Sequence, residues 1–311
     1  VESVQTEFES QPLVRAQLLY VLAETMGELG IYEDATKSMK DALDIRMNEL
    51  GENHPDTFKA IASLGDLLRR QGRYEEAAGY LEDALEKHQL ALGEKNHSTL
   101  DVRRRVGHLH QAQGDHETAE RLYREALAGF RETLGGDDPA TLSAMLNLGI
   151  NLRTQGRYEE AAEYLEVVLE GRLRILGEDD SETLSAFHRL ALLRISQGQY
   201  DEAEPYQRRA LDGFRRVLGT RHPTTLSAAN DMGHLLQLQG RYEEAEPYSR
   251  QALEGYRIVM GSDHLSTMES INGMGMLLQR QGKLEEAKPY FEEALERRLR
   301  ILGTDHPHTL A

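Results

Sequence analysis

Twelve histidines are the side chains of this sequence best suited to binding a metal ion. Four of them share one position of a repeated pattern, just ahead of a predicted helix: His54, His222, His264 and His306. His108 and His110 are two residues apart, so they lie on different faces of a helix. The chain has no cysteine, which excludes thiolate sites and disulfides. We predict no metal site, and we expect the repeated histidines to stabilise helix starts.

Serine, threonine and glutamate also recur, and these residues could act as nucleophiles or acids. Serine and threonine fall near helix starts, as in PATLSA from Pro139 and PTTLSA from Pro223, where they would satisfy helix N-termini. The glutamate pairs in Glu-Glu-Ala suit the positive end of a helix better than acid catalysis. Neither a glycine-rich phosphate loop nor a nucleophile elbow occurs. We therefore predict no catalytic residue and no cofactor, and we expect the protein not to be an enzyme.

The elements that carry these residues repeat every 42 residues, and two series of glycines count this period independently. The first series is Gly30, Gly72, Gly114, Gly156, Gly198, Gly240 and Gly282. The second series is Gly51, Gly93, Gly135, Gly177, Gly219, Gly261 and Gly303. A fixed period of this length predicts a solenoid of stacked units, and a solenoid explains how 311 residues fold without an interdomain linker.

Each period contains two amphipathic helices, as the spacing of apolar residues indicates. The first helix runs from Pro12 toward Gly30, and its partner runs from Tyr32 to Leu50. The next begins near Pro55 and ends at Gln71, before a glycine that can adopt the left-handed conformation. Small residues recur at one position of the first helix, and a recurrent helical glycine implies a close backbone contact. The fold class is therefore all-α, an α-α solenoid of about seven helix pairs.

The charge balance argues against several kinds of partner. The chain has 36 basic and 53 acidic residues, a net charge of −17, which opposes binding to nucleic acid or to anionic lipid. No apolar run approaches the ~20 residues that a membrane span needs, and no signal peptide is recognisable. The absence of cysteine suits a reducing compartment. We expect a cytoplasmic protein that binds neither nucleic acid nor membrane.

The repeat resembles a known family at specific positions. A small residue in the first helix, the glycine turn and two alanines in the second helix, as at Gly65, Gly72, Ala77 and Ala84, resemble the tetratricopeptide repeat. The 42-residue period with its LGxDHPxTL pattern resembles the subclass of kinesin light chains and nephrocystin-3-like proteins. This resemblance implies a right-handed superhelix. It divides the chain into an N-terminal extension (1–11), seven repeat units (12–303) and the truncated start of an eighth unit (304–311).

Two functions are consistent with this resemblance. The first is a protein-interaction scaffold that holds an extended peptide or partner segment in its concave groove. The second is a regulatory or sensory segment of a larger signalling enzyme, because QPLVRAQLLYVLAETMGELGIYEDA resembles the point where such repeats follow the catalytic domain of some bacterial serine/threonine kinases. Apolar residues near the C-terminus, such as Leu295, Leu299 and Ile301, also predict self-association through the terminal repeats.

The resemblance assigns ligand binding to five positions of the first helix in each pair. These positions give the candidate groove residues Arg104, Arg105, His108, Asn147, Arg153, His188, Arg189, Asn230 and His234. Guanidinium groups bind carboxylates bidentately, so we expect an acidic, partly apolar peptide as the ligand. Alternatively, the arginines pair with acidic residues of adjoining repeats, such as Asp101 and Asp231.

The candidate groove also resembles the carboxylate clamp of chaperone-binding tetratricopeptide domains. Asn147 and Arg189 match its side-chain types, and Arg104 stands where a lysine is usual. His108 and Ser185 depart from the clamp, which argues against a strictly C-terminal carboxylate as the ligand.

Overall fold

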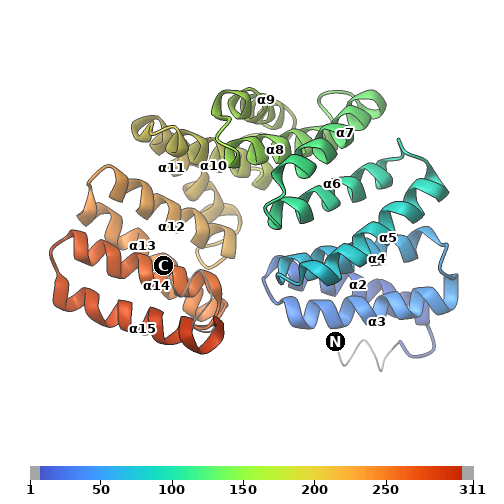
Figure 1. Ribbon diagram of the computed structural model, residues 1–311, viewed down its shortest axis with the longest axis horizontal. Helices are drawn as coiled ribbons and strands as arrows, with labels where there is room; N and C mark the ends of the chain where they lie inside the picture. The colour runs from blue at the N-terminus through green and yellow to red at the C-terminus, as the bar shows by residue number, and fades with distance from the viewer. Residues whose placement is uncertain (1–7, 303–311) are drawn as a thin grey trace. The chain divides into compact units, whose positions relative to one another are not determined.

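A computed structural model describes residues 8–302 and contains fourteen helices, α2 to α15, with no strand in that range (Figure 1). The all-α prediction is confirmed. Two compact units divide the chain at residues 171 and 172, inside helix α9, and each unit is described by itself. The right-handed superhelix of the whole chain stays a prediction.

Unit 1 is a stack of antiparallel helix pairs. It consists of α2 (Pro12–Glu28), α3 (Tyr32–Leu50), α4 (Pro55–Arg70), α5 (Tyr74–Leu92), α6 (His97–Ala112), α7 (His116–Leu134), α8 (Pro139–Thr154) and most of α9 (Tyr158–Leu176). We call α2, α4, α6 and α8 the A helices and the others the B helices. Successive A helices contact one another, so their side chains form one continuous face within this unit.

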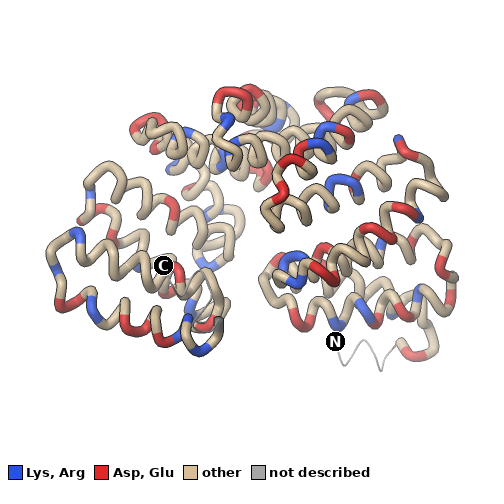
Figure 2. The backbone as a smooth tube through the Cα atoms, in the orientation of Figure 1, with Lys and Arg blue, Asp and Glu red and all other residues tan. Residues whose placement is uncertain are grey.

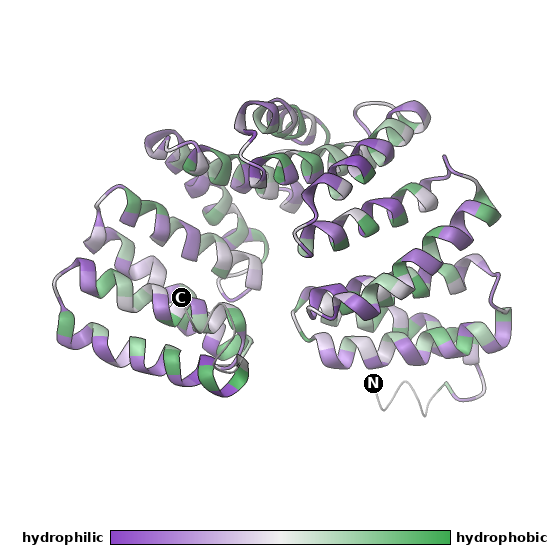
Figure 3. Ribbon diagram, viewed as in Figure 1, coloured by the Kyte–Doolittle hydropathy of each residue, from purple (hydrophilic) through white to green (hydrophobic). Residues whose placement is uncertain are grey.

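Unit 2 repeats the same arrangement. After the end of α9 it contains α10 (Ser181–Ser196), α11 (Tyr200–Val217), α12 (Pro223–Leu238), α13 (Tyr242–Val259), α14 (Leu265–Arg280) and α15 (Leu284–Leu302). Its A helices are α10, α12 and α14. A core of alanine, leucine and methionine side chains joins its helices, and the helices of both units are polar on one side and apolar on the other (Figure 3).

Every A helix except α2 starts at a side chain that caps the first turn. The Nδ1 atoms of His54, His222 and His264 accept hydrogen bonds from the backbone N–H two residues on, at 3.1, 3.2 and 3.2 Å. The prediction that these histidines stabilise helix starts is confirmed, and His306 lies outside the described residues. The capping role predicted for serine and threonine is wrong, because a histidine, asparagine or aspartate already caps each of these helices. Thr141 instead donates from Oγ1 to the Gly135 carbonyl, at 2.8 Å, and ties the helix to the preceding turn.

Glycine closes both kinds of turn and lets the paired helices approach closely. Gly72 has φ +77° and follows α4, as the sequence predicted. In α6, a Cβ atom added at Gly107 would lie 2.7 Å from Cε1 of Tyr123 on α7. At Gly107 the nearest group is thus a side chain of the paired B helix, whereas at the equivalent Gly233 backbone atoms of the paired helix also come close, with Ser249 N at 3.2 Å, as the predicted backbone contact requires.

Apolar side chains on the last helix are exposed. Leu295, Leu299 and Ile301 of α15 are 50%, 42% and 42% exposed. Their exposure was predicted, but self-association through them stays a prediction, as do the domain boundaries. Residues 304–311 lie outside the described part of the chain.

Within residues 8–302, every helix is too short or too polar to cross a membrane.

Candidate peptide-binding site

Helix α6 carries the densest group of candidate groove residues. Asp101, Arg104, Arg105 and His108 are spaced three or four residues apart, which places them on one face of the helix. On the next A helix of the unit, α8, Asn147 stands beside this face. Basic and acidic residues are both distributed over the helices of each unit, as Figure 2 shows.

Asp101 is paired with both arginines of α6. Its Oδ1 accepts a hydrogen bond from Arg104 Nη2 at 2.6 Å, and its Oδ2 accepts one from Arg105 Nε at 2.9 Å. Burial raises the pKa of Asp101, but the charges of Arg105 and Arg104 outweigh it and lower the pKa to about 2. These two arginines are therefore paired with the acidic residue that the alternative named, but Asp101 lies on the same helix and not in an adjoining repeat; the pairing holds their guanidinium groups in fixed positions.

A second carboxylate on α4 extends the network. Asp66 accepts hydrogen bonds from Arg69 Nε at 2.9 Å and from Arg70 Nε at 3.0 Å. Burial of Asp66 opposes its ionisation, but the charges of Arg69, Arg70 and Arg105 hold its pKa well below the usual range. Arg105 also donates from Nη1 to Ser63 Oγ, at 3.4 Å, and so links α6 to α4. The A helices of unit 1 are therefore joined by charged groups as well as by apolar contacts.

His108 is a neutral member of this group. Its ring is hydrogen-bonded to the Asn147 side chain and contacts Tyr123 edge-on, with ring centroids 5.6 Å apart. Burial lowers the pKa of His108 to about 3, and the charges of Arg104 and Arg69 add to the effect. Asn147 Nδ2 is buried and has no hydrogen-bond partner among the described residues. The face thus holds a buried amide donor beside fixed guanidinium groups.

We predict that His108 makes unit 1 sensitive to acid. Its pKa is about 6.5 in an unfolded chain, so below that pH the unfolded state binds a proton that the folded state does not. The histidine's effect on stability is absent above pH ~6.5 and becomes unfavourable as pH falls toward the folded pKa. Between pH 7 and pH 5 we expect His108 to account for a loss of about 2 kcal/mol in the free energy of unfolding.

Urea unfolding across this pH range measures the loss. His108→Gln should flatten the pH dependence, whereas His234→Gln, at an exposed histidine of α12, should leave it as in the unsubstituted protein. Equal slopes for the unsubstituted protein and His108→Gln would contradict the assignment.

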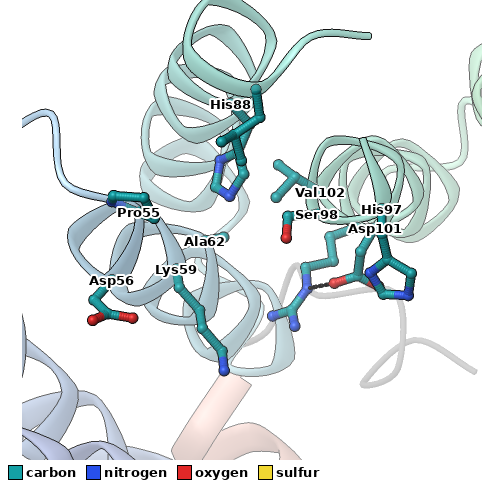
Figure 4. A pocket seen from close by; sticks show the side chains of 11 residues that line it. Pro55, Asp56, Lys59, Ala62, His88, His97, Ser98, Asp101 and Val102 are labelled. Atoms are coloured by element: carbon teal, nitrogen blue, oxygen red, sulfur yellow. Dashed lines mark hydrogen bonds and ion pairs between the residues drawn. The ribbon is translucent and has the colours of Figure 1, made fainter. Parts of the chain in front are cut away.

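A pocket opens on the same face of unit 1, between the first halves of α4 and α6. Its volume is about 310 Å³, and Lys59 and Arg105 line it together with the apolar residues Ala62, Leu92 and Val102. In Figure 4, Lys59 and Asp101 come from the two facing helices, and His88 of α5 lies between them. Lys59 is exposed and has no ion pair among the described residues.

His88 and Leu92 belong to a B helix and were missed by the sequence analysis, which considered only A helices. The sequence did carry a signal for this position, because large side chains also occupy it in other repeats: Arg46, Phe130, Arg172, Phe214 and Tyr256. All of these side chains are buried. In unit 1 the residue at this position, His88, lines the pocket between the A helices α4 and α6.

Unit 2 holds the other candidate residues in a different arrangement. His188 of α10 is 6% exposed, and its Nε2 lies 2.8 Å from Oδ2 of Asp231 on α12. Asp231 is thus paired as the alternative predicted, although with a histidine. Arg189 and Asn230 are partly buried, and His234 is exposed. In unit 1, Arg153 lies in the last turn of α8. That all the candidate residues line one groove stays a prediction, because they belong to two units.

In residues 8–302, no three histidine, aspartate or glutamate side chains come together as metal ligands would.

Comparison with protein families identifies the repeat. Models described as tetratricopeptide repeat match residues 14–89, 98–174, 182–258 and 267–308. These ranges cover most of the chain and follow the repeat units predicted from the glycine period. A search of curated proteins finds no match.

Solved structures with a similar fold support this result. A protein assigned as a kinesin light chain with nearly identical TPR-like repeats, from Podosopora anserina, has a TM-score of 0.57 and 22% identity over 66% of this chain and 97% of its own. BtubC (BKLC) from P. vanneervenii has a TM-score of 0.56 and 18% identity, with coverages of 75% and 91%. The apo form of RapI has a TM-score of 0.61 and 14% identity, with coverages of 92% and 98%. At these identities the similarity shows the fold alone.

Proposed function

Because the chain belongs to the tetratricopeptide repeat family, whose repeats generally mediate contacts between proteins, we propose that it is a scaffold that binds an acidic, partly apolar segment of a partner protein. The segment would lie in an extended conformation along the A helices of unit 1. No step of this function requires a catalytic residue, a cofactor or a metal ion.

The observation that carries the proposal is an excess of hydrogen-bond donors on this face. A guanidinium group has five N–H donors, and Asp101 accepts only one from Arg104 and one from Arg105. Asn147 Nδ2 is a further buried donor without a partner. A buried donor without a partner carries a desolvation penalty, which a ligand carboxylate would remove. Acidic side chains are therefore the ligand groups that this face is best able to bind.

The pocket beside these donors explains why the ligand should also be partly apolar. Its cations, Lys59 and Arg105, stand next to Ala62, Leu92 and Val102, so a carboxylate and an aliphatic side chain can be accommodated together. Arg105 is held in place by Asp101, so it loses little conformational entropy on binding. The exposed Lys59 side chain can move to meet the ligand.

The second function considered, a regulatory segment of a larger signalling enzyme such as a bacterial serine/threonine kinase, stays a prediction. Such a segment would also act by binding, so the test below applies to both. A cytoplasmic location likewise stays a prediction.

We predict that Lys59→Glu weakens binding of an acidic peptide about tenfold, because it replaces an attraction at the pocket by a repulsion. The probe is a short peptide of alternating Glu and Leu, and calorimetric titration at low salt measures its affinity. The matched control is Lys37→Glu, which makes the same charge change at an exposed position of the B helix α3.

The control should bind the peptide nearly as well as the unsubstituted protein. A peptide of alternating Gln and Leu should bind weakly to all three proteins. The proposal fails if Lys59→Glu and Lys37→Glu reduce the affinity equally, or if the uncharged peptide binds as tightly as the acidic one.

A further inference from the structure

A second cavity lies on the B helices of unit 2. It has a volume of about 580 Å³ and opens between α11, the loop before α12, and α13. The residues that matter to its chemistry are Arg215, Arg221, Arg250, Glu254 and Ile258. We call this cavity the B-side crevice. It is separate from the A-helix face that we propose as the peptide groove.

In other repeats an ion pair lies at the position that corresponds to the crevice. The pair joins the loop before an A helix to the B helix that follows, 37 residues later in the chain. Its members are Lys95 with Glu132 at 2.5 Å, Asp179 with Arg216 at 2.5 Å, and Asp263 with Arg300. At the same two positions the crevice has Arg221 and Ile258.

Arg221 therefore has no oppositely charged residue at the B-helix position that supplies the ion-pair partner in these other repeats. It is exposed and makes no ion pair among the described residues, and Ile258 is 64% exposed. The repeat that contains Asn53 and Leu90 also lacks the pair, but its two residues are uncharged and leave no cation unpaired. The crevice thus combines an unpaired cation with an exposed aliphatic side chain.

The two other arginines of the crevice are already paired with neighbouring side chains. Arg215 Nη2 donates to Gln251 at 2.6 Å and Nη1 to Asp212 at 3.3 Å, while Arg250 Nη2 donates to Glu246 at 2.8 Å. Three arginines line the crevice, against one carboxylate, Glu254. Because Asp212 and Glu246 balance Arg215 and Arg250, Arg221 is the cation of this lining that has no ion-pair partner among the described residues.

We propose that the B-side crevice is a second protein-binding site, which takes an acidic segment of a partner protein. An aspartate or glutamate of the segment pairs with Arg221 and so supplies the carboxylate that Glu132 provides in another repeat. A neighbouring aliphatic side chain of the segment covers Ile258. Nucleic acid fits this site less well, because Glu254 would repel a phosphate backbone and Ile258 would stay exposed.

The δ1-methyl resonance of Ile258 reports on the crevice directly. We expect a peptide of alternating Glu and Leu to shift this resonance in a saturable way at low salt, and a peptide of alternating Gln and Leu to leave it unmoved. Arg221→Asp, which installs the residue found at this position in the repeats of Asp137, Asp179 and Asp263, should weaken the response at least about tenfold. Its thermal unfolding should match that of the unsubstituted protein.

Lys59→Glu separates the two sites. It should preserve the Ile258 response while it weakens binding at the A-helix face. The inference is wrong if the Ile258 resonance does not shift, shifts equally with both peptides, or shifts as strongly in Arg221→Asp. None of these results bears on the proposed groove of unit 1, which the Lys59→Glu titration tests separately. A shift of Ile258 that follows protein concentration without peptide would show that the crevice binds a second copy of the chain, which would also overturn the inference.

Discussion

Replacing Asp101 by asparagine is expected to lower the free energy of unfolding by about 2 kcal/mol, since removing one member of a partly buried ion-pair network leaves its partners uncompensated. Asp101 accepts hydrogen bonds from two arginines, and the side chains of Asp101, Arg104 and Arg105 are 27%, 21% and 22% exposed. Asparagine keeps the shape of the side chain but removes the charge that balances both guanidinium groups. Arg105 would then keep only the more distant charges of Asp66 and Glu24 among the carboxylates that act on it.

Urea unfolding followed by circular dichroism measures this loss. The matched control is Arg73→Gln, which breaks the exposed pair between Arg73 and Glu76, where the atoms are 2.7 Å apart and the side chains 42% and 51% exposed. Solvent screens an exposed pair of this kind and leaves it little effect on stability, so the control should unfold nearly as the unsubstituted protein does. Equal losses in the two variants would show that the Asp101 network is only a surface feature.

Replacing Gly107 by leucine is expected to cost about 3 kcal/mol, because the new side chain overlaps a ring that cannot move aside. Its Cβ atom alone would lie 2.7 and 2.9 Å from Cε1 and Cδ1 of Tyr123. Tyr123 is fully buried, and its hydroxyl donates to Gln111 Oε1 at 2.8 Å. The clash should exceed the gain of about 1 kcal/mol that leucine brings to a helix relative to glycine.

The same substitution at Gly79 should raise the free energy of unfolding instead of lowering it. Gly79 is also helical, in α5, but an added Cβ atom there meets nothing within 4 Å. Gly79→Leu should therefore stabilise the protein by up to about 1 kcal/mol in the same unfolding measurement. A destabilisation by Gly79→Leu as large as that by Gly107→Leu would mean that leucine disturbs these helices for a reason other than packing.

The fold was readable from the sequence because its signals are local and repeated. Gly72 and Gly93 end two successive helices one half-period apart, and the predicted partner helix, Tyr32 to Leu50, has those bounds in the structure. Periodicity of 42 residues fixes which residues are equivalent, and equivalence predicts which small residues pack together. What it does not give is the atom that meets each glycine, since Tyr123, Leu165 and Phe291 occupy equivalent positions with different shapes.

The candidate site was predictable only in part. The positions of Arg104, Arg105 and His108 on one helix face follow from their spacing, but their charge states depend on contacts between helices. His108 is neutral because of its burial and the charges of Arg104 and Arg69, and the contacts with other helices cannot be read from its local sequence. The pocket was missed because Lys59 and Arg105 come from different A helices and His88 from the B helix between them.

The most direct test of the central claim is the response of the Asn147 side-chain amide to the acidic peptide. In the proposed complex, Asn147 Nδ2 gains the acceptor that it lacks in the structure described here. We predict that titration with the peptide of alternating Glu and Leu shifts the Asn147 Nδ2 resonance in a saturable way, and that Lys59→Glu weakens this response. An Asn147 resonance that stays unmoved while the peptide binds would contradict the claim that the A-helix face of unit 1 binds acidic segments.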